Sequence, residues 1–225
     1  MESLLQPCPC QEDATRAFTL VELTVVILTV ALVFLFLTIL LFYPAKEKSH
    51  RIACVNNLKN VGLGFRIFAS ANSNLFPMQK IAQIPDGRTA TVGIGSRTVV
   101  EYFQSLSNEL GTPVLLHCPA DSRKRALSFA ELKNGNVSYF VGVDSNGTAP
   151  TSLLVGDRNL ATNGIAIGPG LAEITKGMSL GWTKDLHRFR GNVVLGDGSV
   201  QQFSNERLSS FLPGTGLTTN RIIIP

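Results

Sequence analysis

The chain has 225 residues, a formal net charge of +4 and an apolar fraction of 44%. This is enough apolar material for one domain of ordinary size and a further apolar segment. The 20 Lys and Arg residues are dispersed, without the dense basic run that marks a nucleic-acid-binding surface, so a nucleic acid is not an expected partner.

Residues 1–17 precede the apolar segment and form the predicted leader. They contain Cys8 and Cys10, whose spacing superficially resembles that of zinc ligands. A tetrahedral zinc site needs a second pair of ligands, and none is nearby. We therefore expect no metal here and interpret the pair as a neutral part of a segment that is removed.

Residues 18–43 form an apolar run whose only formal charge is Glu22. The run exceeds the roughly 18 apolar residues that indicate a membrane helix, and it is too long for the core of a secretory signal peptide. A polar helical continuation follows it, with no small-residue cleavage site. On these grounds alone the segment is a single-pass membrane anchor.

The sequence Arg16-Ala17-Phe18-Thr19-Leu20-Val21-Glu22-Leu23 closely resembles the processing signal of type IV prepilins and type II secretion pseudopilins. The resemblance implies that a prepilin peptidase cuts between Ala17 and Phe18 and that the new amine of Phe18 is N-methylated. Ala17 stands where the family usually has glycine. The leader also carries Glu2, Glu12 and Asp13 against a single Arg16, whereas leaders in the family are usually basic.

Glu22 is the most informative residue of this prepilin-like motif. A carboxylate inside an apolar helix is costly, which favours a functional role over a Glu that merely lies near the membrane edge. The family implies that Glu22 of an incoming subunit pairs with the charged amine of Phe18 in a neighbouring subunit. The resemblance therefore implies that the partners of this protein are other pilin-like subunits, the prepilin peptidase, an assembly platform and a cytoplasmic ATPase.

The membrane orientation follows from the resemblance and not from charge. Lys46, Lys48 and Arg51 follow the apolar run, and the positive-inside rule alone would place them in the cytoplasm. The prepilin motif implies the opposite orientation. We expect a single-pass protein of the inner membrane with its head in the periplasm or outside the cell.

Residues 44–71 are predicted to continue the helix after a break candidate at Pro44. The apolar residues of this segment recur at spacings of four and three and so share one stripe: Cys54, Leu58, Val61, Phe65 and Phe68. We expect the apolar stripe of this segment to pack against the head, which would cover it. The segment also resembles the C-x-N-N-L-x-x-x-G helix of a group of pseudopilin-like proteins.

Residues 72–225 are predicted to form the head. We expect the long helix to end at 72–74, an irregular stretch to about 95, a short helix over 99–110 and a buried segment over 115–119. Residues 137–143 and 152–156 predict two antiparallel strands. Residues 192–195 and 199–203 flank a Gly-Asp-Gly turn and predict a hairpin, after which Ser204 caps a helix over 205–212.

Cys54 and Cys118 lie beyond the membrane segment, and an even pair of cysteines in an oxidising compartment allows a disulfide. The segment around Cys118 resembles the L-x-C-P-x-D signature of the same pseudopilin-like group, which makes this pair the disulfide candidate. The alternative is two buried free thiols, because cysteine is commonly buried.

We expect neither an active site nor a cofactor. His187 lies ten residues before Asp197 and resembles the H-x9-D-G tail of the group, and we weighed it with Asp197 or Asp157 as a catalytic pair. The chain shows no nucleophile in an elbow context and no second histidine at ligand spacing. Asp121, Asp157 and Asp197 lack the run of oxygen ligands typical of a calcium loop, so no metal is assigned.

The expected fold is α+β and pilin-like: a long N-terminal helix, with a membrane half and an amphipathic half, packed on a small antiparallel sheet. The function expected is that of a structural subunit of a type II secretion-like pseudopilus or a type IV pilus-like filament. An anchored protein whose head binds polysaccharide or DNA is the alternative. An anchored hydrolase would need a nucleophile and a base that the sequence does not show.

Overall fold

The structure is a computed structural model that describes residues 19–80 and 97–225, with the backbone alone for residues 42–45. The predicted leader lies outside the described residues. The helices are α1 (Leu20–Ala71), α2 (Pro77–Lys80), α3 (Val99–Ser105), α4 (Ser107–Leu110) and α5 (Asn205–Phe211), with single 3-10 turns at Pro113–Leu116, Phe129–Glu131, Asn134–Asn136 and Leu212–Thr215.

The chain divides into two compact units, residues 1–45 and 46–225, and α1 is the element that they share. In the first unit, α1 exposes its apolar side chains all round, from Leu20 to Leu41. Among the described residues α1 is the one helix that is long and apolar enough to cross a membrane. A candidate transmembrane helix therefore lies near the N-terminus, as the sequence predicts.

In the second unit, the amphipathic half of α1 packs on an antiparallel sheet, so the fold is α+β. Cys54, Leu58, Val61 and Phe65 are fully buried, and Phe68 packs against the same core at partial exposure. The predicted stripe is therefore the face that the head covers. The helix ends where predicted, since Ser73 and Asn74 adopt left-handed backbone conformations directly after Ala71.

The sheet has six strands in the order β5-β9-β1-β2-β7-β8, and every neighbouring pair is antiparallel. A second sheet has the order β4-β3-β6. The strands are β1 (Tyr139–Gly142), β2 (Leu153–Asp157), β3 (Leu160–Thr162), β4 (Ile165–Ala166), β5 (Gly170–Thr175), β6 (Leu180–Trp182), β7 (Arg190–Leu195), β8 (Val200–Ser204) and β9 (Thr219–Ile224).

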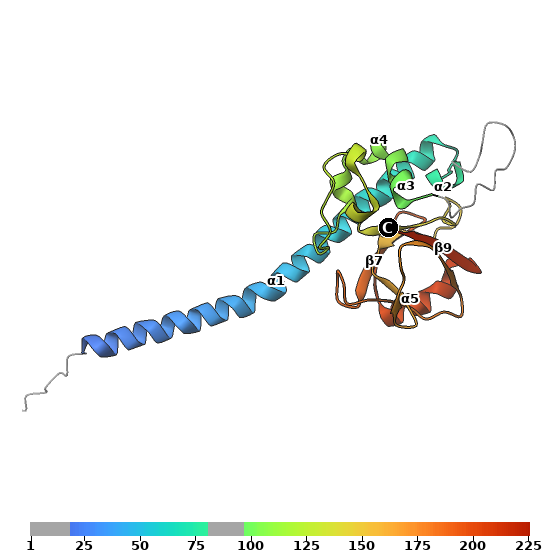
Figure 1. The fold of residues 1–225 in the computed structure, drawn as a ribbon. Coiled ribbons are helices and arrows are strands. Elements are labelled where there is room, and N and C mark those ends of the chain that lie inside the picture. The colour runs from blue at the N-terminus through green and yellow to red at the C-terminus, as the bar shows by residue number, and fades with distance from the viewer. Residues whose placement is uncertain (1–18, 81–96) are drawn as a thin grey trace, which may run out of the picture. The chain divides into compact units, whose positions relative to one another are not determined.

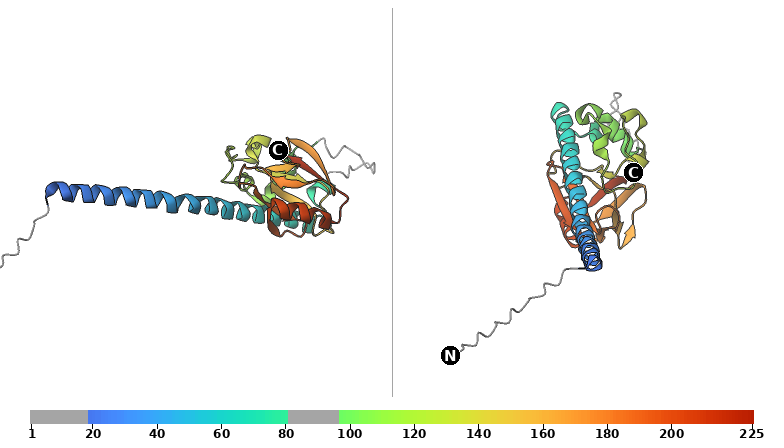
Figure 2. Two further views of the ribbon diagram at one scale, coloured as in Figure 1. Left: turned by 90° about the horizontal axis from the view of Figure 1, so that it is seen from below. Right: turned by 90° about the vertical axis from the view of Figure 1, so that its left-hand side faces the viewer.

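The inner strands β1, β2 and β7 of the six-stranded sheet are buried on both faces. Tyr139, Val141 and Val194 belong to the core shared with α1 and α3, whereas their neighbours Phe140 and Val193 belong to a second core with α5 and the smaller sheet. This alternation follows from the pleat, which turns successive side chains to opposite faces. Figure 1 shows α3 and α4 on the same side of the sheet as α1, with α5 on the other side, and Figure 2 shows the strands from two further directions.

Most predicted elements of the head are confirmed. The strand pair β1–β2, the hairpin β7–β8 and the cap of α5 by Ser204 are present. The helix predicted over 99–110 is two helices, because the chain leaves the helical conformation at Leu106. The irregular stretch predicted after residue 74 contains the short helix α2, and its remainder over 81–95 lies outside the described residues.

Replacing Gly142 with alanine should destabilise the head strongly. A Cβ at this position of β1 would lie 1.8 Å from the backbone oxygen of Leu153 in β2, so the two central strands would have to separate. Overpacking of this kind should lower the free energy of unfolding by about 3 kcal/mol. The measurement is denaturant unfolding of the detergent-extracted chain.

Gly177→Ala is the matched control, because nothing lies within 4 Å of a Cβ there. It should leave the unfolding midpoint unchanged. Equal midpoints for the two variants would mean that β1 and β2 are not packed as the structure has them.

Candidate functional site

Glu22 lies in the first turn of α1 and forms a reciprocal cap with Thr19. The Thr19 Oγ1 accepts a hydrogen bond from the Glu22 backbone N–H at 3.3 Å, and Glu22 Oε2 accepts bonds from the backbone N–H and the hydroxyl of Thr19 at 2.9 and 2.8 Å. This is a capping box, which satisfies donors that the start of a helix leaves unpaired. The carboxylate is exposed and stands at the N-terminal end of the apolar segment.

The predicted cleavage and methylation residues, Ala17 and Phe18, lie outside the described residues. Thr19 is the first described residue, and it adjoins Phe18. Glu22 therefore stands four positions after Phe18, the residue at which the processed chain would begin.

A second group of candidate functional side chains lies in the interior of the head. Cys54 comes from α1, Cys118 from the loop after the Pro113–Leu116 turn, Asp157 from the end of β2 and His187 from the loop before β7. One sulfur, nitrogen or oxygen atom of each lies within 4.8 Å of the corresponding atoms of the other three. All four residues are buried, and we call them the buried cluster.

The sheet positions one side of the buried cluster. Asp157 is the register partner of Tyr139 and, like Val155, faces the side of the sheet that α1 covers. The loop that carries His187 is unusual, because Leu186, Arg188 and Phe189 all have left-handed backbone conformations. Strained backbone of this kind persists only where the surrounding structure holds it, and it often accompanies a functional site.

Contacts inside the buried cluster are short. Cys54 Sγ lies 3.2 Å from Asp157 Oδ1, and Cys118 Sγ lies 3.4 Å from His187 Nε2. The same Nε2 lies 3.7 Å from Asp157 Oδ2. His187 Nδ1 is buried and has no hydrogen-bond partner among the described residues.

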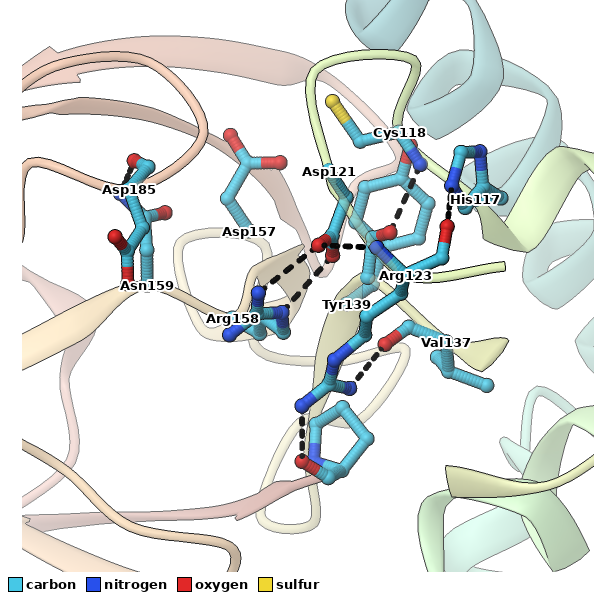
Figure 3. Close-up of polar contacts among 12 residues, drawn as sticks. His117, Cys118, Asp121, Arg123, Val137, Tyr139, Asp157, Arg158, Asn159 and Asp185 are labelled. Atoms are coloured by element: carbon cyan, nitrogen blue, oxygen red, sulfur yellow. Dashed lines mark hydrogen bonds and ion pairs between the residues drawn. The ribbon is translucent and has the colours of Figure 1, made fainter. Parts of the chain in front are cut away.

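Surrounding polar groups fix these side chains. Asp157 Oδ2 accepts hydrogen bonds from the backbone N–H and from Nδ2 of Asn192, at 2.7 and 2.8 Å. The Tyr139 hydroxyl lies 3.4 Å from Cys54 Sγ. Figure 3 shows Cys118, Tyr139 and Asp157 beside a second polar contact, in which Arg158 binds both carboxylate oxygens of Asp121 at 2.9 Å.

Electrostatics in the buried cluster favour a thiolate at Cys118. A hydrogen bond from Cys54 and a second contact with His187 outweigh burial and lower the pKa of Cys118 to about 6. Burial raises the pKa of Cys54 well above its ordinary value, and burial also raises the pKa of Asp157. For His187, burial is outweighed by the hydrogen bond with Cys118 and the charge of Asp157, so its pKa is raised.

The arrangement does not have the geometry of a nucleophilic triad. In such a triad the carboxylate binds one ring nitrogen of the histidine and the nucleophile faces the other. Here Cys118 and Asp157 both approach Nε2 of His187, and the thiol of Cys118 is fully buried. The groups converge on one point, as ligands do, and do not form a relay.

Comparisons with protein-family models, curated proteins and solved structures find no match. The functional argument therefore rests on the chain itself, on Glu22 at the start of α1 and on the buried cluster.

The structure brings together Cys54 and Cys118, the predicted disulfide pair, and also His187 and Asp157, which the sequence analysis weighed as a catalytic pair. Cys54 and Cys118 are neighbours in the buried cluster and are free thiols in the structure, so the disulfide stays a prediction. Asp197 lies outside the buried cluster, exposed in the β7–β8 turn, where it accepts a hydrogen bond from the Ser199 N–H. Asp121 is the partner of Arg158.

Sequence reasoning missed the convergence of Asp157 and His187 on the two cysteines. The four residues are spaced by 64, 39 and 30 positions, at 54, 118, 157 and 187, which no short ligand motif covers. One signal was available: Asp157 ends a strand whose other residues are all apolar or glycine, and a carboxylate in such a position needs a partner.

Proposed function

We propose that this protein is a structural, non-catalytic subunit of a pilin-like filament, anchored in the inner membrane by α1 and processed before Phe18. Its partners are other pilin-like subunits, a prepilin peptidase, and the platform and ATPase that assemble the filament. The observation that carries the proposal is the single carboxylate of the apolar segment, Glu22, placed in the first turn of α1.

The physical argument begins with the cost of this carboxylate. The apolar run of residues 18–43 has no other charged side chain, and a lone charge in the hydrocarbon region costs several kcal/mol unless it is paired. The capping box supplies three hydrogen bonds within one subunit but no opposite charge. The amine that processing would create at Phe18 supplies that charge in a neighbouring subunit.

The rest of α1 is consistent with a subunit that packs through its helix. The amphipathic half buries one stripe in its own head, while Ile52, Leu63 and Ile67 stay exposed on the remaining surface. Exposed apolar side chains on a helix that continues an apolar anchor are suited to contacts with other copies of such a helix. A head displayed on a simple anchor has no need of them.

Mass spectrometry of the N-terminus tests the proposal first. The full chain is expressed with the matching prepilin peptidase, extracted from membranes and sequenced at its N-terminus. We expect a mature protein that begins at N-methylated Phe18. A catalytically inactive peptidase serves as the control and should leave residues 1–17 in place.

A chain that keeps Met1 to Ala17 with the active peptidase would contradict the proposal. Ala17 and the acidic leader would then have lost processing, and a membrane-anchored protein whose head binds polysaccharide or DNA would explain the chain better. Binding of such a ligand by a chain with Glu22 replaced would support that alternative.

A further inference from the structure

The four side chains of the buried cluster present one ligand atom each to a common point. We propose that Cys54, Cys118, Asp157 and His187 bind a single zinc ion in the interior of the head. This inference goes beyond the filament function and does not depend on it, because it rests on the second unit of the chain alone.

The distances match a tetrahedral zinc site. Zinc bonds of about 2.3 Å to sulfur and about 2.0–2.2 Å to nitrogen or oxygen place neighbouring ligand atoms about 3.3–3.8 Å apart. The two closest pairs of ligand atoms, Cys54 Sγ with Asp157 Oδ1 and Cys118 Sγ with His187 Nε2, measure 3.2 and 3.4 Å, and all four ligand atoms lie within 4.8 Å of one another. Closing the widest separation by about 1 Å would complete the tetrahedron.

The ligand set selects zinc over other common cations. Two thiolates, one imidazole and one carboxylate combine soft and borderline donors, which suit zinc, whereas calcium and magnesium require a shell of oxygen ligands. Four protein ligands leave no open position, so the site would be structural. Any thiol that still carries its proton releases it when its sulfur binds the metal.

A second layer of hydrogen bonds is already in place. Asn192 holds Asp157 Oδ2 through two bonds, which leaves Oδ1 directed at Cys54 and free to bind the metal. The Tyr139 hydroxyl and the Asn192 amide, at 3.4 and 3.8 Å, can donate to the Cys54 thiolate. Outer groups of this kind orient metal ligands and raise affinity.

The charge of the filled site can be balanced. Two thiolates, one carboxylate and Zn²⁺ leave a net charge of −1, and Arg51, Arg190 and Arg207 line a cavity of about 240 Å³ that His187 also lines. The cavity has room for water, which would accept a hydrogen bond from the Nδ1–H of His187. Metal binding by Nε2 thus gives a role to both nitrogens of a ring whose Nδ1 has no protein partner among the described residues.

Without a metal, the buried cluster keeps a carboxylate and two sulfur atoms in an apolar core. An unpaired buried charge is strongly destabilising, and the neighbouring imidazole offsets it in part. A disulfide between Cys54 and Cys118 would remove both thiols and leave Asp157 and His187 as a pair. The same two sulfur atoms cannot bind zinc and form a disulfide, so the zinc content and the thiol state of the protein together decide between the two.

The first experiment measures zinc in the full chain, extracted in detergent and purified without a metal-affinity step. Mass spectrometry of zinc and sulfur gives the number of ions per chain. We expect one zinc ion per chain and a loss of most of it in Cys118→Ser. His50→Gln changes a histidine outside the buried cluster and should keep its zinc.

Two further readouts remain interpretable if Cys118→Ser fails to fold. A strong chelator should lower the Tm of the unaltered chain, and added zinc should restore it, because a ligand that binds only the folded state stabilises it. Asn192→Ala keeps all four ligands and should weaken zinc binding about 10-fold in a chelator competition.

Three outcomes would overturn the proposal. The purified chain could hold no zinc after incubation with zinc under reducing conditions. Zinc could persist in folded Cys118→Ser at the level of His50→Gln. Thiol labelling of the unreduced protein could find Cys54 and Cys118 joined in a disulfide, which would leave the disulfide prediction confirmed and the site without its two sulfur ligands.

Discussion

Glu22→Gln should abolish filament assembly while the protein still inserts into the membrane and is still cleaved. Glutamine can take the place of glutamate in a capping box, so the hydrogen bonds with Thr19 are retained. The negative charge is lost, and with it the proposed pairing with the Phe18 amine of a neighbouring subunit. We expect no filaments by electron microscopy of cells and an unchanged amount of protein in the membrane fraction.

Thr19→Val is the matched control for the cap. It removes the hydroxyl that bonds Glu22 but keeps the carboxylate, and the loss of a cap costs only about 1 kcal/mol. Filaments should therefore form. The opposite pattern, with filaments in Glu22→Gln and none in Thr19→Val, would show that Glu22 serves its own helix and not a neighbour.

Phe65→Ala should cost the head about 4 kcal/mol of stability, the usual cost of removing a fully buried phenylalanine. Phe65 lies on the buried stripe of α1 and makes edge-to-face contacts with Phe76 and Phe103, at ring-centroid distances of 5.9 and 6.2 Å. Thermal or denaturant unfolding of the full chain measures the loss. A chain that keeps its unfolding midpoint would mean that α1 does not pack on the head as the structure has it.

Leu63→Ala tests the opposite surface of the same helix. Leu63 is 57% exposed, so its removal should leave stability unchanged within about 0.5 kcal/mol. Fewer filaments in Leu63→Ala at unchanged stability would identify this surface as a contact between subunits. The pair of variants thus separates folding from assembly along one helix.

Sequence patterns predicted the elements whose signals are local. The stripe from Cys54 to Phe65 depends on a periodicity of 3.6 residues, and the β7–β8 hairpin depends on Gly198, which has a left-handed conformation. Strand β9 was missed, although Ile222, Ile223 and Ile224 form a β-branched run near the C-terminus. An apolar run of this length can belong to a strand or to a buried helix, and its place between β5 and β1 depends on the topology.

The buried cluster was predictable only in part, because the order of the strands brings two of its four residues to the cysteines. Cysteines are few, so Cys54 and Cys118 were paired without knowledge of the fold. Asp157 and His187 reach them because β2 and β7 are neighbours in the sheet beneath α1. Strand order is set by packing over the whole head, and no local pattern encodes it.

The continuity of α1 has a mechanical consequence. One helix, Leu20–Ala71, belongs both to the apolar segment and to the head. A force that extracts the apolar segment from a bilayer would travel along the helical hydrogen bonds and reach the head as shear between the buried stripe and the sheet. Cys54 lies at the N-terminal end of that stripe, so a crosslink at this residue would bear the load first and resist separation of the helix from the strands.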